Sequence, residues 1–214
     1  MAAEVLGVPA FRLASLHPHP DAALDDDAFI AASARFISAF SVLDEMAVTE
    51  ERVLLFVDDL KVQAKLTGLI QRRYQLAAAP MVINGTVAGS SRQARVERFQ
   101  QADDHFDVMI LSPRAGGVGL TLTRANHVIH LSRWWNPAVE DQCNGRALRI
   151  GQTRPVTVHV PLATLSSQSR SFDQNLHACF NRKRRLMHEA LLPPEATESE
   201  RQQLLAESLA GASI

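Results

Sequence analysis

Cysteine is scarce in this sequence, since Cys143 and Cys179 are the only two among 214 residues. Two widely separated cysteines are too few for a disulfide framework and offer no cysteine-based metal site. We therefore expect no metal site on this chain and a reducing, cytoplasmic setting.

Long apolar runs are also lacking, and no charged and then apolar stretch opens the chain. A membrane-spanning helix needs about 20 apolar residues, and a secretion signal needs that amino-terminal pattern. Neither a membrane-spanning segment nor a membrane partner is therefore expected.

An excess of positive charge is absent, because 22 lysines and arginines stand against 23 aspartates and glutamates. The net charge of −1 gives no general attraction to a polyanion. Arginines are nevertheless concentrated between residues 133 and 154, and basic residues fill positions 182–185. Any nucleic-acid site must therefore be local.

Several catalytic motifs are missing as well. The sequence has no His-x-x-x-His pair, no Gly-x-Ser-x-Gly elbow, no Cys-x-x-Cys pair and no Gly-x-x-x-x-Gly-Lys-Ser/Thr loop. The glycine-rich segment SPRAGGVGLTLT has Leu122 where a dinucleotide fingerprint needs its third glycine. Metal-dependent hydrolysis, nucleophilic catalysis and independent triphosphate binding are thus not indicated.

Short runs rich in Val, Ile and Leu alternate with amphipathic segments along the middle of the chain. Strands are expected at 52–57, 81–84, 107–112, 127–132 and 156–160, and helices at 60–75, 91–101 and 137–149. Apolar strands separated by helices are typical of a parallel sheet covered on both faces. The fold class is therefore α/β, with an open, doubly wound sheet whose ligands gather at the carboxyl ends of its strands.

Helices are also expected on both sides of this core. Residues 26–46 and 171–192 have helical periodicity, and a further short helix is expected within 195–214. In the first of these, Phe29, Phe36, Phe40 and Leu43 recur at helical intervals. We divide the chain into a lead-in with an N-terminal helix (1–50), a core (51–165) and a C-terminal helix with a tail (166–214).

Two loops that follow predicted strands have residues suited to phosphate binding. One passes through Gly85 and reaches Arg92 at the start of a helix, where backbone amides and a guanidinium can meet a phosphate. The other, at 112–123, has three glycines that allow the backbone to approach a ligand closely. A simple glycine turn with a solvated arginine, and a tight strand-to-helix connection, are the alternatives.

The segment RWWNPAVEDQCNGRALRIGQ concentrates tryptophan, arginine and an Asn-Pro pair. Proline suits the first turn of a helix, and the predicted helix places Gln142, Arg146 and Arg149 on one face. Two adjacent guanidinium groups repel each other unless an anion lies between them. Either Glu140 and Asp141 pair with them, or they form an arginine finger for a transferred phosphoryl group, which is worth on the order of 10³ to 10⁵ in rate.

Three segments, taken in order, resemble the second RecA-like lobe of Swi/Snf-type DNA-dependent ATPases, within the superfamily 2 helicases. They are RVLLFVDDLKVQAKL, INGTVAGSSRQARVERFQ and VMILSPRAGGVGLTLTRANHVIHLSRWWNPAVEDQCNGRALRIGQTRPVTVH, and they cover roughly residues 52–160. The most specific parts are the Ala-Gly-Gly-x-Gly-x-x-Leu run, Trp-Asn-Pro and Arg-x-x-Arg-Ile-Gly-Gln.

This resemblance implies a RecA-like open parallel sheet with helices on both faces, an N-terminal helix and a C-terminal brace helix. It also implies that ATP and Mg²⁺ bind between two lobes and are held mainly by the first. On this chain the matching positions are Arg146 and Arg149 for catalytic arginine fingers, Gly117, Gly119, Gln142 and Gln152 for ATP contacts, and Gly85, Arg92, Ser112, Arg114 and Trp135 for DNA contacts.

The function implied is that of the second motor lobe of an ATP-dependent double-stranded-DNA translocase, inactive without its N-terminal RecA-like lobe. The helix at 171–192 resembles a brace of bacterial members, which implies a bacterial, cytoplasmic and nucleoid-associated protein. The alternative is a degenerate, non-catalytic lobe that acts as a DNA- or protein-interaction module.

Overall fold

The computed structural model describes residues 18, 20–101, 105–114, 119–134, 136–164, 170–189, 199, 200, 202, 203 and 206. These residues belong to two compact units. The first, called the sheet unit below, holds residues 37–133 and 139–161, and the second, called the flanking unit, holds the described parts of 1–36, 134–138 and 162–214.

The sheet unit is built on five parallel strands that follow the apolar runs of the sequence. They are β1 (Arg52–Phe56), β2 (Met81–Ile83), β3 (Asp107–Leu111), β4 (His127–His130) and β5 (Thr157–His159). The strand order is β2-β3-β1-β4-β5, and Leu54 of β1 lies beside Met109 of β3 and Val128 of β4. The prediction of an open parallel sheet is confirmed.

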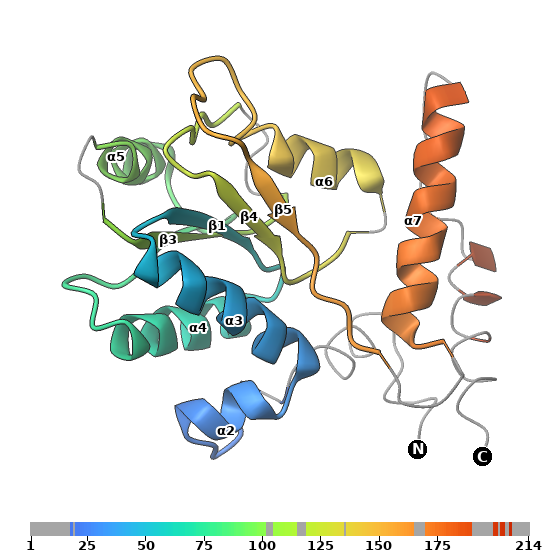
Figure 1. Ribbon diagram of the computed structural model, residues 1–214, viewed down its shortest axis with the longest axis horizontal. Helices are drawn as coiled ribbons and strands as arrows, with labels where there is room; N and C mark the ends of the chain where they lie inside the picture. Colours follow the sequence, from blue (N-terminus) through green and yellow to red (C-terminus); the bar gives the residue numbers. More distant parts are fainter. Residues whose placement is uncertain are drawn as a thin grey trace. The chain divides into compact units, whose positions relative to one another are not determined.

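Helices cover both faces of this sheet (Figure 1). On one side lie α3 (Ala34–Val48) and α4 (Leu60–Arg73), and on the other lie α5 (Gly89–Phe99) and α6 (Pro137–Asn144). Because alternate side chains of a strand point to opposite faces, Phe56 and Met109 share one face, where they pack with Phe99 of α5 and Cys143 of α6 in a fully buried cluster. Val53 and Leu55, which alternate with Phe56 along β1 and point to the other face, are also buried, so both faces of the sheet are covered.

Residues 26–46 form two helices rather than the single helix expected. The first, α2 (Asp26–Ala31), begins after Asp25, whose carboxylate accepts a hydrogen bond from a first-turn amide at 2.7 Å. The helix stops before Ser33, whose hydroxyl oxygen accepts a hydrogen bond from the Phe36 amide at 3.4 Å. A local bond of this kind competes with a continuous helix. The predicted apolar positions are confirmed, because Phe29, Phe36, Phe40 and Leu43 are all buried.

The flanking unit contains the long helix α7 (Phe172–Glu189), which confirms the helix expected there. A capping box begins it, because the Gln174 amide donates to Ser171 Oγ at 3.2 Å and the Ser171 amide donates to Gln174 Oε1 at 2.9 Å. Arg35 and Asp173 form a buried ion pair in which Nε and Oδ2 are 2.6 Å apart. The first turn of α7 is thereby fixed to the N-terminal part of the same unit.

Within the described ranges, none of the helices has the length and apolar character needed to cross a membrane. The short helix expected within 195–214 falls largely outside those ranges.

Candidate functional site

The predicted site residues follow the strands at one edge of the sheet unit. Residues 84–92 come after β2, residues 112–114 come after β3, and α6 with the turns up to residue 152 comes after β4. Since the carboxyl ends of parallel strands meet at the same edge, residues 84–92, residues 112–114 and the start of α6 are brought to one side of the sheet. The chain then returns along α6, and Gln152 donates to the Ala125 carbonyl just before β4.

Helix α6 is shorter than the sequence predicts, because it ends at Asn144 and not at Arg149. Gly145 comes next, and the chain then turns tightly, with the Arg146 amide donating to the carbonyl three residues back at 3.2 Å. Glycine disfavours helix continuation, and bonds of this spacing tighten a helix end. The prediction that Gln142 shares one helical face with the two arginines is therefore wrong.

Arg146 is buried, with 5% of its surface exposed. Its Nη2 donates weakly to the Pro113 carbonyl at 3.4 Å, and its guanidinium carbon lies 5.3 Å from the centre of the Phe56 ring. Its Nη1 is enclosed and has no hydrogen-bond partner among the described residues. Burial lowers the pKa of the Arg146 guanidinium, and the nearby charge of Arg92 lowers this pKa further. An anion bound beside Arg92 and Arg146 would offset the repulsion between the two guanidinium groups and the cost of burying Arg146.

Arg149 is exposed, and the loop after β3 anchors it. Its Nη1 donates to the Gly119 carbonyl at 2.9 Å and to the Leu120 carbonyl at 3.3 Å. A Cβ atom at Gly119 would lie 3.1 Å from Arg149 Nη2, so glycine allows the guanidinium to rest this close to the loop. The neighbouring Leu148 and Ile150 are exposed by 55% and 99%. Arg149 is thus a surface residue held by loop carbonyls, and its two neighbours in the sequence are exposed apolar residues.

The two glutamines predicted to support ATP binding differ in their surroundings. Gln142 is exposed on α6. Gln152 is engaged within the chain, because its Nε2 donates to the Ala125 carbonyl at 2.8 Å and its Oε1 accepts a hydrogen bond from the Arg154 amide at 3.0 Å. Gln152 therefore fixes the turn after Arg149 against the residues that precede β4.

Arg133 and Glu140 form a buried bidentate ion pair between the end of β4 and α6. The Nε–Oε1 distance is 2.8 Å and the Nη2–Oε2 distance is 2.9 Å. Glu140, one of the two acids that the sequence offered as partners for Arg146 and Arg149, is thus committed to Arg133. The pair instead orients α6 against the strand before it.

The loop after β2 leads into a helix without a side-chain cap. Asn84 Oδ1 accepts two hydrogen bonds from the residue two positions on, at 3.1 Å and 2.7 Å, in a turn that leaves Gly85 exposed. Ala88, at the N-cap of α5, makes no side-chain hydrogen bond to the first turn. Arg92 Nη2 donates to the Val87 carbonyl at 3.3 Å, and its buried Nε has no partner among the described residues. Uncapped amides beside a cation are suited to an anion.

A buried amide network lies beneath these loops, and the sequence analysis missed it. Gln63 Nε2 donates to Ser112 Oγ at 2.8 Å and to the Val57 carbonyl at 2.7 Å. Gln63 Oε1 accepts a hydrogen bond from Asn84 Nδ2 at 2.9 Å. Ser112 is consequently 8% exposed, whereas Arg114, two residues further on, is exposed. The sequence feature that could have indicated this network is Gln63, a polar residue on the buried face of the amphipathic helix α4.

Gly117 and Trp135 lie outside the described residues. Burial raises the pKa of the Cys143 thiol to about 12, which disfavours the nucleophilic thiolate. In the part of the chain that the structure covers, no group of His, Cys, Asp and Glu side chains could hold a metal ion.

The fold and the arginine-bearing edge of the sheet define a RecA-like lobe, and comparisons with known proteins give the family. Residues 38–151 match the helicase conserved C-terminal domain. The putative ATP-dependent helicase/translocase YwqA of Bacillus subtilis is 35% identical over 156 residues, which cover 72% of this chain and 16% of YwqA. The Zorya protein ZorD of Escherichia coli is 33% identical over 186 residues, which cover 84% of this chain and 17% of ZorD. The chain therefore spans about a sixth of the length of these relatives.

Solved structures share the fold at low sequence identity. The C-terminal part of the Fun30 ATPase domain has a TM-score of 0.68 at 22% identity, over 89% of this chain and 58% of that chain. The Sulfolobus solfataricus SWI2/SNF2 ATPase core domain has a TM-score of 0.66 at 21% identity, over 97% of this chain and 38% of that chain. The chain belongs to the helicase conserved C-terminal domain family and has the fold of the C-terminal RecA-like lobe of SWI2/SNF2 ATPases.

Proposed function

We propose that this chain is the second motor lobe of an ATP-dependent double-stranded-DNA translocase. Membership of the helicase family supports this proposal, as does the helicase/translocase name of the similar Bacillus protein. The observation that carries it is Arg149, an exposed guanidinium that is anchored by backbone carbonyls and whose neighbours in the sequence, Leu148 and Ile150, are exposed apolar residues.

Arg149 acts as the arginine finger in this proposal. The Gly119 and Leu120 carbonyls hold its guanidinium in place without neutralising its charge. ATP and Mg²⁺ are held mainly by the first lobe, and the other N–H groups of Arg149 face the charge that develops on the transferred phosphoryl group. A contribution of this kind is worth on the order of 10³ to 10⁵ in rate, or about 4 to 7 kcal/mol of barrier.

Arg146 acts indirectly, because it is buried. A phosphate that approaches Arg92 offsets the repulsion between the two guanidinium groups, which otherwise lowers the pKa of Arg146. DNA contact is assigned to the exposed Gly85 and Arg114 together with Arg92, to the Ser112 hydroxyl and to Trp135. Of the ATP contacts, Gly117, Gly119 and Gln142 are assigned to the nucleotide, while Gln152 positions the turn that carries Arg149.

The test is ATP turnover in the two-lobed ATPase that contains this chain, with and without duplex DNA. Replacing Arg149 by alanine removes the finger, and we expect the DNA-stimulated rate to fall by about 10³-fold or more. Thermal unfolding of the isolated variant chain should be unchanged, because the Arg149 side chain is exposed.

Arg98→Ala is the matched control, since Arg98 is also exposed but belongs to α5 and not to the turn after α6. It should keep the wild-type turnover. If Arg149→Ala keeps it too, the finger assignment is wrong. If the wild type shows no turnover at all, the non-catalytic interaction module becomes the better interpretation.

A further inference from the structure

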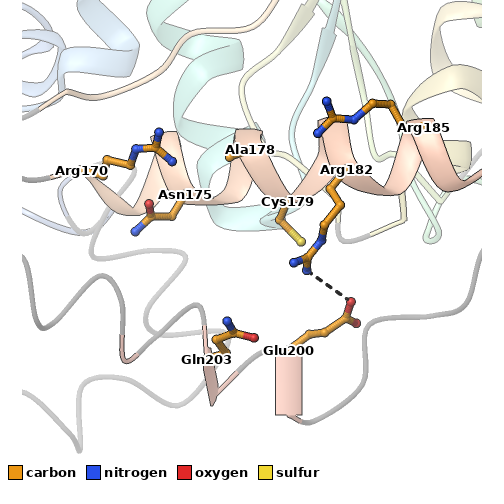
Figure 2. A pocket seen from close by; sticks show the side chains of 8 residues that line it. All are labelled: Arg170, Asn175, Ala178, Cys179, Arg182, Arg185, Glu200 and Gln203. Atoms are coloured by element: carbon orange, nitrogen blue, oxygen red, sulfur yellow. Dashed lines mark ion pairs between the residues drawn. The ribbon is translucent and has the colours of Figure 1, made fainter.

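A hollow of about 220 Å³ lies along α7 in the flanking unit (Figure 2). Its charged lining consists of three arginines, Arg170, Arg182 and Arg185, and one carboxylate, that of Glu200. The uncharged polar side chain of Asn175 also lines it. The hollow therefore carries an excess of positive charge, in a chain whose net charge is −1.

Helix α7 presents Arg182 and Arg185 because of its periodicity, and Arg170 lies two residues before the helix. Leu176, Phe180 and Lys183 recur at intervals of four and three residues and are 5%, 0% and 3% exposed, so they mark the buried stripe. Arg182 and Arg185 fall outside this stripe and are exposed. Exposed arginines that line a hollow are available to an external anion.

One anion from the chain itself already occupies this site. The Glu200 carboxylate lies 3.9 Å from Arg182 Nη2 and 3.6 Å from Lys183 Nζ. Charge-assisted hydrogen bonds are shorter, at about 2.7 to 2.9 Å, so these contacts are loose ion pairs. Carboxylates and phosphates can both accept two parallel hydrogen bonds from one guanidinium, but Glu200 does not reach this geometry. A phosphate that approaches Arg182 to hydrogen-bond distance would therefore bind more strongly than this carboxylate.

We propose that this hollow contacts the phosphate backbone of duplex DNA and that Glu200 competes with the phosphates for it. The identity of the polyanion rests on the proposed function. Arg185 lies 13 positions after Phe172, the first residue of α7, and Arg170 lies two residues before it. The helical part alone spans about 20 Å at roughly 1.5 Å per helical residue. That span exceeds one phosphate and suits a charged backbone. None of the described residues that line the hollow is aromatic, which favours backbone contact over base stacking.

The test is the affinity of the 214-residue chain for a fluorescent DNA duplex, measured by anisotropy over a series of salt concentrations. Each phosphate contact contributes about 0.9 to the slope of log affinity against log salt. The double variant Arg182→Gln/Arg185→Gln should bind more weakly, and its slope should be shallower by about two. Glu200→Gln should change affinity in the opposite direction and bind duplex DNA more tightly than the wild type.

Arg184→Gln is the matched control. Arg184 belongs to the same basic run and its loss changes the net charge by the same amount per residue, but it does not line the hollow. We expect it to keep the wild-type affinity and slope. Thermal unfolding is measured for every variant, and if the double variant melts early, Arg182→Lys/Arg185→Lys takes its place. That variant keeps the charge, loses the bidentate geometry and should bind with intermediate affinity.

Two results would overturn the proposal while leaving the rest of the lobe's DNA binding in place. One is a folded double variant with wild-type affinity and slope. The other is a loss of affinity in Arg184→Gln that equals, per substituted arginine, the loss in the double variant, because this would indicate a general effect of charge. A wild-type chain that binds vesicles of anionic lipid but no duplex would also overturn it. The proposed function is judged separately, by the turnover of the Arg149→Ala variant.

Discussion

Arg146 and Arg149 have opposite surroundings although three positions separate them in the sequence. Arg149 is exposed and bonded to loop carbonyls, whereas Arg146 is buried against Phe56. The motif identifies both arginines, but their difference depends on where the helix ends at Gly145 and on how the turn behind it packs. A sequence motif gives the residue types but does not show how deeply each side chain is buried.

His127 and His159 form a pair on the neighbouring strands β4 and β5. Their Nδ1 and Nε2 atoms are 2.9 Å apart and their rings are stacked, and His127 Nε2 lies 2.9 Å from Glu51 Oε2. Only one proton can lie between the two facing nitrogens. Burial lowers the pKa of His159, the charge of His127 lowers it further, and Glu45 partly opposes this shift.

The lowered pKa of His159 predicts a loss of stability on mild acidification. Histidine in the unfolded chain becomes protonated below its ordinary pKa of 6.5. In the folded chain, His159 becomes protonated only at a lower pH, near its lowered pKa. The free energy of unfolding should therefore fall as the pH falls through this window. The His159→Gln variant keeps a hydrogen-bond donor for His127 but has no titrating group at this position. Urea unfolding at several pH values between 5.5 and 7.5 should therefore show that its free energy of unfolding changes less with pH than that of the wild type. Equal slopes for both proteins would contradict this prediction.

At the scale of elements, α4 and α5 begin differently. Asp59 caps α4, with its carboxylate accepting a hydrogen bond from the Val62 amide at 2.9 Å. Ala88 stands in the same place before α5 with φ −60° and ψ 152°, the extended geometry that an N-cap residue needs, but its side chain makes no cap. The uncapped amides precede Arg92, where we propose that a DNA phosphate binds.

A side-chain helix cap introduced at Ala88 should therefore stabilise the chain and weaken its binding to DNA. We expect Ala88→Asp to raise the free energy of unfolding by about 0.5 to 2 kcal/mol and to weaken duplex binding, because its carboxylate takes the amides and repels phosphate. Ala88→Ser should also stabilise the chain, but it adds no charge and should weaken binding less. Urea unfolding and anisotropy measure the two effects on the same samples. Tighter DNA binding by Ala88→Asp would exclude a phosphate at this helix start.

Elements differ in how far the sequence predicts them. The five strands are apolar enough to be recognised directly, and their parallel arrangement follows from the helices between them. Their order in the sheet was not predicted. The ends of helices were less predictable. The bond between Ser33 and the Phe36 amide divides the first helix, and Gly145 ends α6 early, because local hydrogen bonds and turns decide these boundaries.

At the scale of the whole molecule, the sequence predicts the family because the motif residues are contiguous along the chain. The buried Gln63 network and the Arg35–Asp173 ion pair were not predicted. Their members are far apart in sequence and meet only in the folded chain. The hollow along α7 likewise includes Glu200, which lies beyond the helix in the sequence and pairs with Arg182 in the folded chain. Contacts of this kind carry no periodicity that a single sequence could reveal.

The exposed apolar side chains beside Arg149 give a prediction about assembly with the first lobe. Ile150 is 99% exposed, so burial within this chain cannot explain an isoleucine there. If it packs against the first lobe, Ile150→Ser should lower DNA-stimulated ATP turnover in the two-lobed protein and leave the unfolding of the isolated chain within about 0.5 kcal/mol of wild type. Val48→Ser is the matched control, because Val48 is 84% exposed on α3. Equal turnover in both variants would mean that the surface around Arg149 does not meet another lobe, whereas a loss confined to Ile150→Ser would assign that surface to the ATPase interface.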